Sequence, residues 1–365
     1  MSFIRTIQET GTMADSIRFL VEFLPRIGTT SVVLDGIKEP SLKYSDSGKI
    51  TVQDGRGERL DIALPYNPGK VNSKRLVKVG GSDRDEYLLT LKSEDVPMDK
   101  SRNDVLMMPQ MKWSKRQLNG LKNFKLCCIQ CDMDIIDHDN CFRLNEMPSE
   151  FWMELMDYWH CHKPQDKTSE FYSLQKNSLS PCLNEILIGD SFFQALEDTF
   201  AGRTTVVDEN IAMCSNCKKP LGRRTSDRML RIPKWQLRLK SDGVCDDVFP
   251  AESEIISILL NCNRANSTRY ILLRSGNTQL YIWLFSMGIE VTLANGKSLH
   301  NCLKIFYSDV IPSNVGFKAN IDEEQVDKVP LDKFVDALET TNSILPSSKQ
   351  RFGTWKISYL SAAVE

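Results

Sequence analysis

The sequence of 365 residues contains no apolar run long enough to cross a membrane. A spanning helix needs about 20 predominantly apolar residues in a row, and no stretch approaches that length. The first 16 residues, MSFIRTIQETGTMADS, also contain no apolar core of a secretory signal. We therefore expect a protein of a reducing compartment with no membrane partner.

A large net charge is also missing. Lysine and arginine total 46 and the acids total 48, so the net charge of −2 excludes a polyanion binder that uses its whole surface. Locally, residues 105–131 contain no acid, and residues 218–240 contain nine basic residues and one acid. RNA contact, solvated faces or an acidic partner would each account for these runs. With Trp113, Phe124 and Trp235 as their only aromatics, they lack the series of interleaved aromatics on which single strands stack.

Common catalytic signatures are absent as well. The chain has no P-loop, no GxGxxG and no HExxH pattern, and neither an internal repeat nor a low-complexity tract. It does contain eleven cysteines, an odd number. In a reducing compartment these are better explained as thiols or metal ligands than as disulfides.

Two CxxC motifs account for four of the cysteines. Cys128 and Cys131 form the first pair, and Cys214 and Cys217, within CSNCKKPLG, form the second. Each pair places two thiolates in a tight turn, and two such knuckles complete a four-thiolate structural zinc site. A redox CxxC is the alternative, but no βαβ pattern surrounds either pair. Cys127 is expected to pack rather than to bind metal.

The overall pattern predicts a β-rich α+β protein. Short β-branched segments fill residues 16–100, as in an antiparallel sandwich or a barrel. The predicted domains are an N-terminal β domain (1–104), a zinc-knuckle region (105–232) and a C-terminal α+β domain (233–365). In the last, helices are expected in AESEIISILLNC and LDKFVDALETTNSIL, a hairpin at Gly276–Asn277, and separate strands in IEVTLANG and CLKIFYSDV.

An aromatic helix and a Cys-His segment lie between the two knuckles. In PSEFWMELMDYWH, Trp152 and Trp159 share an apolar helical face that would serve as core or as a docking surface. His160, Cys161 and His162 follow. They are read either as a helix end near the dipole, as a Cys-His pair presented to another molecule, or as a nucleophile pair.

Several motifs, in order along nearly the whole chain, resemble the ubiquitin-conjugating-enzyme-binding, HECT-like ubiquitin ligases. The family has animal members and a fungal cleavage-and-polyadenylation counterpart. The matching segments are VEFLPRIGTTSVVL, CIQC, YWHCHKP, ILIGDSFF, CSNCKKPLG, NSTRYILL, LYIWLF, LKIFYSD and LPSSK.

The resemblance implies binding of a ubiquitin-conjugating enzyme and association with the zinc-dependent endonuclease that cleaves pre-messenger RNA at its 3′ end. It implies zinc at the four CxxC cysteines, a partner-binding role for Cys161 and His162, and a cytoplasmic and nuclear location. The helix residues Trp152 and Trp159 would anchor the partner.

Two functional classes remain open. One is an enzyme or adaptor of ubiquitin transfer, and the other is a non-catalytic chaperone or inhibitor whose Cys161 caps the endonuclease metals. HECT enzymes form a thioester on a cysteine close to the chain end. Here the last cysteine is Cys302, in the strand-like LHNCLKIFY and followed by 63 residues. A buried strand thiol is inert, so no catalytic residue is assigned.

Overall fold

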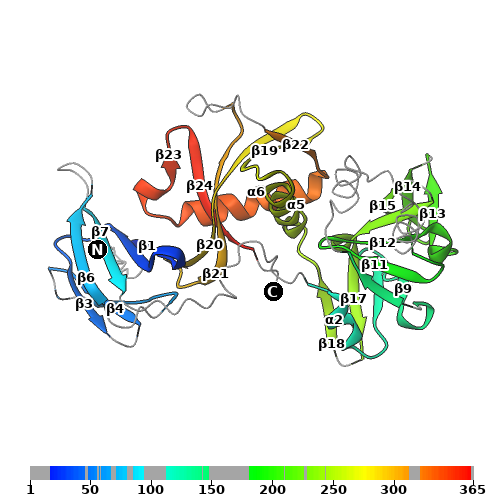
Figure 1. Ribbon diagram of the computed structural model, residues 1–365, viewed down its shortest axis with the longest axis horizontal. Coiled ribbons are helices and arrows are strands. Elements are labelled where there is room, and N and C mark those ends of the chain that lie inside the picture. The colour runs from blue at the N-terminus through cyan, green and yellow to red at the C-terminus, as the bar shows by residue number, and fades with distance from the viewer. Residues whose placement is uncertain are drawn as a thin grey trace, which may run out of the picture. The chain divides into compact units, whose positions relative to one another are not determined.

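The computed structural model describes residues 17–45, 48–55, 57, 59–66, 71–79, 85–93, 112–141, 143–147, 181–208, 210–225, 228–242, 244–311 and 321–362 (Figure 1). Contacts divide the chain into two units. Unit 1 comprises residues 1–107, 269–323 and 335–363, and unit 2 comprises residues 108–268, 324–334 and 364–365.

Unit 1 is built around a large, mainly antiparallel sheet. Its strands are β1 (Arg18–Leu24), β2 (Thr29–Asp35), β6 (Val71–Lys78), β7 (Glu86–Ser93), β19 (Tyr270–Ser275), β20 (Thr278–Leu293), β21 (Ser298–Ser308), β22 (Asp322–Gln325), β23 (Arg351–Phe352) and β24 (Trp355–Ser361). The order is β23-β24-β21-β20-β1-β2-β7-β6, with β19 also pairing with β20 and β22. Strands from both ends of the chain therefore form one sheet.

A second, three-stranded sheet covers the N-terminal strands. It contains β3 (Ser41–Ser45), β4 (Lys49–Gln53) and β5 (Arg59–Ala63). Apolar residues that alternate along these strands meet those of β1, β2 and β7 in one buried cluster, which includes Phe19, Val21, Val32, Ile50 and Val52. Alternation with period two gives each strand one buried face, so two sheets can share a core. The predicted N-terminal antiparallel β structure is confirmed.

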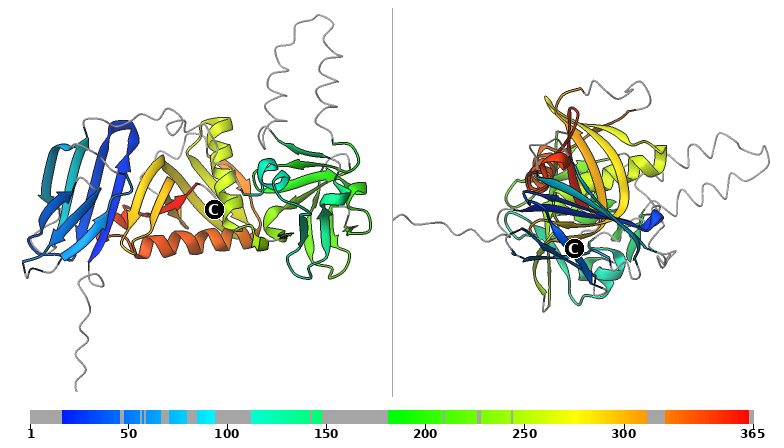
Figure 2. Two further views of the ribbon diagram at one scale, coloured as in Figure 1. Left: turned by 90° about the horizontal axis from the view of Figure 1, so that it is seen from below. Right: turned by 90° about the vertical axis from the view of Figure 1, so that its left-hand side faces the viewer.

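The second half of the large sheet carries a helix. Leu338 and Asn342 of α6 (Lys328–Ser343) hydrogen-bond to β24: the Ser358 hydroxyl donates to the Leu338 carbonyl, and the Asn342 amide donates to the Ile357 carbonyl. Figure 2, left, shows α6 in orange running along the yellow-to-red strands. These contacts attach α6 to β24, the last strand along the chain.

A buried ion pair joins β1 to the C-terminal strands. Glu22 of β1 is only 7% exposed and accepts hydrogen bonds from the Lys304 ammonium at 2.8 Å and the Tyr359 hydroxyl at 2.9 Å. Burial, and after it the negative charge of Glu22, raises the pKa of Tyr359 well above its usual value. Because an unpaired buried charge is costly, this network favours one register between distant strands.

Unit 2 contains two further sheets. The first, of seven strands, has β10 (Arg143–Glu146), β11 (Glu185–Ile188), β12 (Phe192–Leu196), β16 (Met229–Pro233), β15 (Pro220–Arg224), β14 (Ile211–Cys214) and β13 (Thr204–Val207) in that spatial order. The second has β18 (Val244–Val248), β17 (Leu237–Ser241), β8 (Lys125–Cys128) and β9 (Asp134–Asp137). They share a core that includes Trp113, Phe124, Phe193, Phe200 and Phe249.

Two helices of unit 2 have ends that the sequence specifies. In α2 (Lys115–Asn119), Ser114 and Gln117 form a capping box. In α5 (Glu252–Asn266), Glu252 and Glu254 lie in the first turn, where acids complement the helix dipole. Single 3-10 turns are η1 (Pro25–Ile27), η2 (His138–Asn140), η3 (Glu197–Phe200), η4 (Lys234–Gln236) and η5 (Ser347–Lys349).

The described elements confirm the predicted β-rich α+β class, with both predicted C-terminal helices present. One detail differs, because the two strands expected in LYIWLF and IEVTL are a single strand, β20. Gly288 has a φ of 70° beside a register shift between Met287 and Ile289, so the strand bends there without ending. No helix of the described residues is long and apolar enough to span a membrane. The boundaries at 104 and 232 remain predictions.

Candidate metal centre

The first CxxC forms a tight loop at the end of a strand. β8 ends at Cys128, whose amide donates to the Met133 carbonyl at 2.8 Å, while the Asp132 amide donates to the Cys128 carbonyl at 3.0 Å. Asp132 has a φ of 59°, in the left-handed region that lets the chain reverse within a few residues. This turn places Cys128 and Cys131 on the same side of the loop.

The second CxxC repeats the same geometry. β14 ends at Cys214, whose amide donates to the Lys219 carbonyl at 2.8 Å, and the Lys218 amide donates to the Cys214 carbonyl at 3.0 Å. Lys218 has a φ of 60°, as Asp132 has in the first loop. Each motif is therefore a knuckle built by the same pair of backbone hydrogen bonds.

The two knuckles face one another. The sulfur atoms of Cys128, Cys131, Cys214 and Cys217 all lie within 4.8 Å of one another. The Sγ atoms of Cys128 and Cys217 are 3.7 Å apart, and those of Cys131 and Cys214 are 3.6 Å apart. A tetrahedral ion with metal–sulfur bonds of about 2.3 Å sets its sulfurs about 3.8 Å apart. The four cysteines thus fit a four-thiolate metal ion.

Residues around the knuckles hold the two loops in register. The Ser215 hydroxyl donates to the Gly202 carbonyl at 2.9 Å and lies 3.3 Å from the Met133 sulfur of the opposite knuckle. The Ser215 amide donates to the carbonyl of Arg203, whose guanidinium donates to the Ile135 carbonyl at 3.3 Å. Arg203 and Ser215 therefore connect the two loops without using a cysteine sulfur.

Ordinary thiol ionisation would not give four thiolates here. Burial raises the pKa of Cys128 to about 12 and also raises that of Cys214. Burial acts in the same direction on Cys131, but hydrogen bonds from Met133 and Asn216 outweigh it and bring its pKa to about 6. A metal ion would supply the positive charge that stabilises all four thiolates, with proton release on binding.

Cys127, next to the first knuckle, is outside the cluster. Its side chain points to Asp134, with Sγ 3.3 Å from the carboxylate oxygen, and is 1% exposed. Burial and this carboxylate raise the pKa of Cys127 to about 12. The packing role expected from the sequence agrees with this geometry.

The predicted partner-binding residues Trp152, Trp159, Cys161 and His162 lie outside the described residues, in the segment 148–180. Their roles remain predictions. Sequence reasoning also missed Arg203 and Ser215 as supports of the metal centre. Arg203 lies eleven positions before Cys214 and forms no recognisable motif with it, so only the fold reveals this role.

Cys302 lies in the interior of β21 in unit 1. It pairs with Ile289 of β20 on one side and with Ser361 of β24 on the other, and its exposure is 0%. Burial, with a smaller contribution from Glu290, raises the pKa of Cys302 far above its usual range. The thiol is therefore neutral and inaccessible, as its strand pattern predicts.

Two relatives found by comparison with known proteins cover 94% and 64% of this chain. An uncharacterized protein of Saccharomyces cerevisiae is 35% identical over 348 residues, which cover 94% of this chain and 99% of that protein. A Homo sapiens protein named as an E3 ubiquitin-protein ligase is 23% identical over 286 residues, covering 64% of this chain and 71% of the human protein.

No solved structure matches the chain. The family model that matches is described as HECT-like Ubiquitin-conjugating enzyme (E2)-binding, and it matches residues 22–357, which include both knuckles and most of the large sheet of unit 1. The ordered motifs of the sequence led to the same assignment. The chain belongs to the HECT-like, ubiquitin-conjugating-enzyme (E2)-binding family.

Proposed function

We propose that this protein binds a ubiquitin-conjugating enzyme and assists ubiquitin transfer as a ligase-like adaptor, without carrying ubiquitin on Cys302. The observation that supports the role is the E2-binding family model matched over residues 22–357. Relatives whose names describe them as E3 ubiquitin-protein ligases point the same way.

The surroundings of Cys302 support the adaptor form of this role. A thioester step needs an accessible thiolate that attacks the charged conjugating enzyme. Cys302 is fully buried between β20 and β24, so β21 would have to leave the sheet before the sulfur met another protein. That opening would also expose the core around Trp355 and Tyr359.

Replacing Cys302 by alanine tests this adaptor role. We expect Cys302→Ala to leave ubiquitin transfer from a charged conjugating enzyme unchanged within about twofold, while the lost sulfur lowers stability by about 1 kcal/mol. The readout is a non-reducing gel of the reaction. A reducible ubiquitin adduct that disappears in a folded Cys302→Ala protein would refute the adaptor role.

Binding itself is tested separately. Titration of the purified protein against a panel of conjugating enzymes should give at least one saturable interaction. Absence of binding across the panel would refute the proposed function, whatever the behaviour of Cys302.

We propose that the ion held by the two knuckles is zinc and that it is structural. All four donors are thiolates, which zinc favours, and a closed four-coordinate site leaves no position for substrate. Cys128 and Cys214 are buried in the unit 2 core, so this ion would contribute to folding rather than to chemistry.

A second proposed function is non-catalytic restraint of the pre-messenger RNA 3′-end endonuclease, in the nucleus and cytoplasm. It rests on the family resemblance and on the sequence YWHCHKP, in which Cys161 offers a soft metal ligand and His162 a second donor. Trp152 and Trp159 would supply aromatic anchors of the kind that dominate interfaces. RNA contact through the basic runs would be secondary.

Cys161→Ala tests this second function. It is expected to leave the metal bound by the isolated protein unchanged, because the four knuckle sulfurs form a complete set. The same change should weaken inhibition of the endonuclease by roughly tenfold or more. Elemental analysis and a cleavage assay measure the two effects, and Cys182→Ser, at an exposed cysteine, is the matched control. Metal loss in Cys161→Ala would contradict the capping role.

A further inference from the structure

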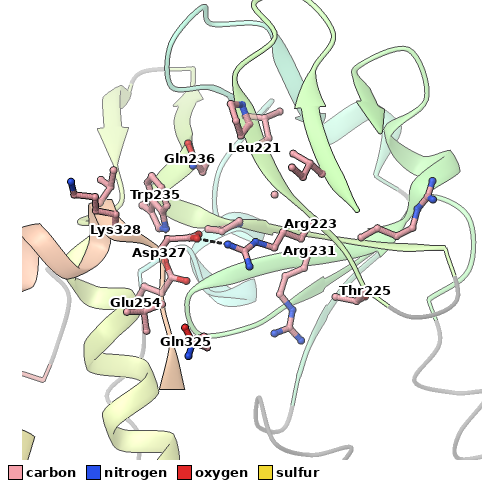
Figure 3. A pocket seen from close by; sticks show the side chains of 17 residues that line it. Leu221, Arg223, Thr225, Arg231, Trp235, Gln236, Glu254, Gln325, Asp327 and Lys328 are labelled. Atoms are coloured by element: carbon pink, nitrogen blue, oxygen red, sulfur yellow. Dashed lines mark hydrogen bonds and ion pairs between the residues drawn. The ribbon is translucent and has the colours of Figure 1, made fainter. Parts of the chain in front are cut away.

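Unit 2 contains a cavity of about 570 Å³ on one face of its seven-stranded sheet (Figure 3). Its walls come from β15, the end of β16, the turn η4 and the segment that joins β22 to α6. Leu221, Arg223, Arg231, Trp235 and Asp327 are among the lining residues. Basic and apolar side chains therefore meet in one concave surface.

Two arginines lie directly opposite one another in this cavity. Arg223 of β15 and Arg231 of β16 are paired in the antiparallel register, so their side chains lie on the same face of the sheet. Like charges directly opposite each other destabilise a sheet. An anion beside the two guanidinium groups would lower this repulsion.

A carboxylate of this same chain, that of Asp327, supplies part of the negative charge beside the two arginines. Figure 3 shows the Arg223 guanidinium directed at the Asp327 carboxylate, to which it donates a hydrogen bond. The Arg231 guanidinium lies 4.0 Å from the centre of the Phe192 ring, and its Nε donates to Gln194 at 3.2 Å. Asp327 thus demonstrates that a carboxylate on an extended segment fits this wall. Arg223 remains 70% exposed and open to a further ligand.

The remaining charges around the cavity leave it basic. Glu254 accepts a hydrogen bond from the Trp235 indole, and Arg224 pairs with Glu197 at 2.6 Å. Lys328, at the start of α6, adds an exposed cation. With Glu197 counted beside the two acids of the lining, four basic residues meet three acids, so the cavity keeps an excess of one basic residue.

The apolar part of the cavity decides which kind of anion fits. The exposed residues Pro220 and Val329 form an aliphatic surface beside the half-buried ring of Trp235. A single aromatic among aliphatic residues suits a peptide side chain. Nucleic acid strands instead need successive aromatics for stacking.

We propose that this cavity binds an extended acidic peptide. One carboxylate of the peptide lies between Arg223 and Arg231, with charge-assisted hydrogen bonds to both, and a neighbouring aliphatic side chain packs on Val329 and Trp235. Asp327 competes with the peptide for Arg223 and so lowers the affinity. This assignment is independent of the proposed role in ubiquitin transfer.

The probe is a fluorescein-labelled octapeptide of alternating aspartate and leucine, titrated with the full-length, metal-loaded protein and followed by anisotropy. Arg231→Gln should weaken binding about tenfold through loss of one charge-assisted contact. Asp327→Asn should strengthen it several-fold, because the internal competitor is removed. Arg228→Gln is the matched control: Arg228 pairs with Asp198 and does not line the cavity, so its loss should change binding less than twofold.

A gain of affinity in Asp327→Asn cannot arise from misfolding, which keeps the test decisive even if Arg231→Gln is unstable. Equal losses in Arg231→Gln and Arg228→Gln would overturn the assignment, as would unchanged affinity in Asp327→Asn. Tighter binding of a single-stranded RNA octamer that depends on Arg223 and Arg231 would also overturn it, in favour of a nucleic acid site.

Discussion

Replacing Cys214 and Cys217 together by serine is expected to abolish metal retention and to prevent unit 2 from folding. Serine hydroxyls do not ionise at neutral pH and are poor zinc ligands, so the remaining pair cannot close the site. The free energy of binding for structural zinc is about 10–16 kcal/mol, comparable to or larger than the net stability of a typical domain. The double variant should therefore be insoluble or rapidly cleaved in limited proteolysis.

The matched control for this double variant is Cys127→Ala. Cys127 precedes the first ligand but its sulfur contacts Asp134 instead of the cluster, so its loss should leave one metal ion per chain. Elemental analysis of both variants and of the parent protein measures the effect. Zinc retained in full by the double variant, or no zinc in the parent protein, would refute the assignment of the four cysteines.

Gly222→Ala is expected to destabilise unit 2 strongly. A Cβ at this position would overlap the carbonyl oxygen of Arg231 and crowd the backbone of Ile232 on the neighbouring strand β16. Backbone atoms within a paired sheet cannot move aside as a flexible side chain can. We expect β15 to separate from β16, with a loss of more than about 3 kcal/mol in the free energy of unfolding.

Urea unfolding of the metal-loaded protein measures this loss. Gly55→Ala serves as the matched control, because a Cβ there meets no atom within 4 Å, and its effect should stay below about 1 kcal/mol. A Gly222→Ala protein as stable as the Gly55→Ala control would show that the two strands tolerate a wider separation.

The cluster of four cysteines could be predicted from sequence because the pattern that indicates it is local. Two thiolates three positions apart can bind one metal ion through a local turn, independently of the rest of the fold. The pairs Cys128–Cys131 and Cys214–Cys217 both have this spacing. The residues that connect the two cysteine loops could not be predicted in this way. Arg203 and Ser215 act through backbone carbonyls on distant segments, and neither residue type in isolation predicts such a contact.

In the large sheet, too, the sequence predicts local structure but not long-range contacts. Short β-branched and apolar segments predicted β1, β2 and β7 as strands. Periodicity does not identify which strand lies beside which. The antiparallel pairing of β1 with β20 joins regions assigned to opposite ends of the chain, and only tertiary contacts such as Glu22 with Lys304 specify it.

Those same contacts determine when unit 1 can be completed during synthesis. Glu22 meets Lys304 and Tyr359, which are 282 and 337 residues further along the chain. At ribosomal rates of about 5–20 residues per second, synthesis of the 282 residues from Glu22 to Lys304 takes roughly 15 to 55 seconds. For most of that interval the edge of β1 that later pairs with β20 has no partner strand, and an apolar strand edge is a template for aggregation. We therefore expect this edge of the N-terminal strands to need protection until β20 has left the ribosome.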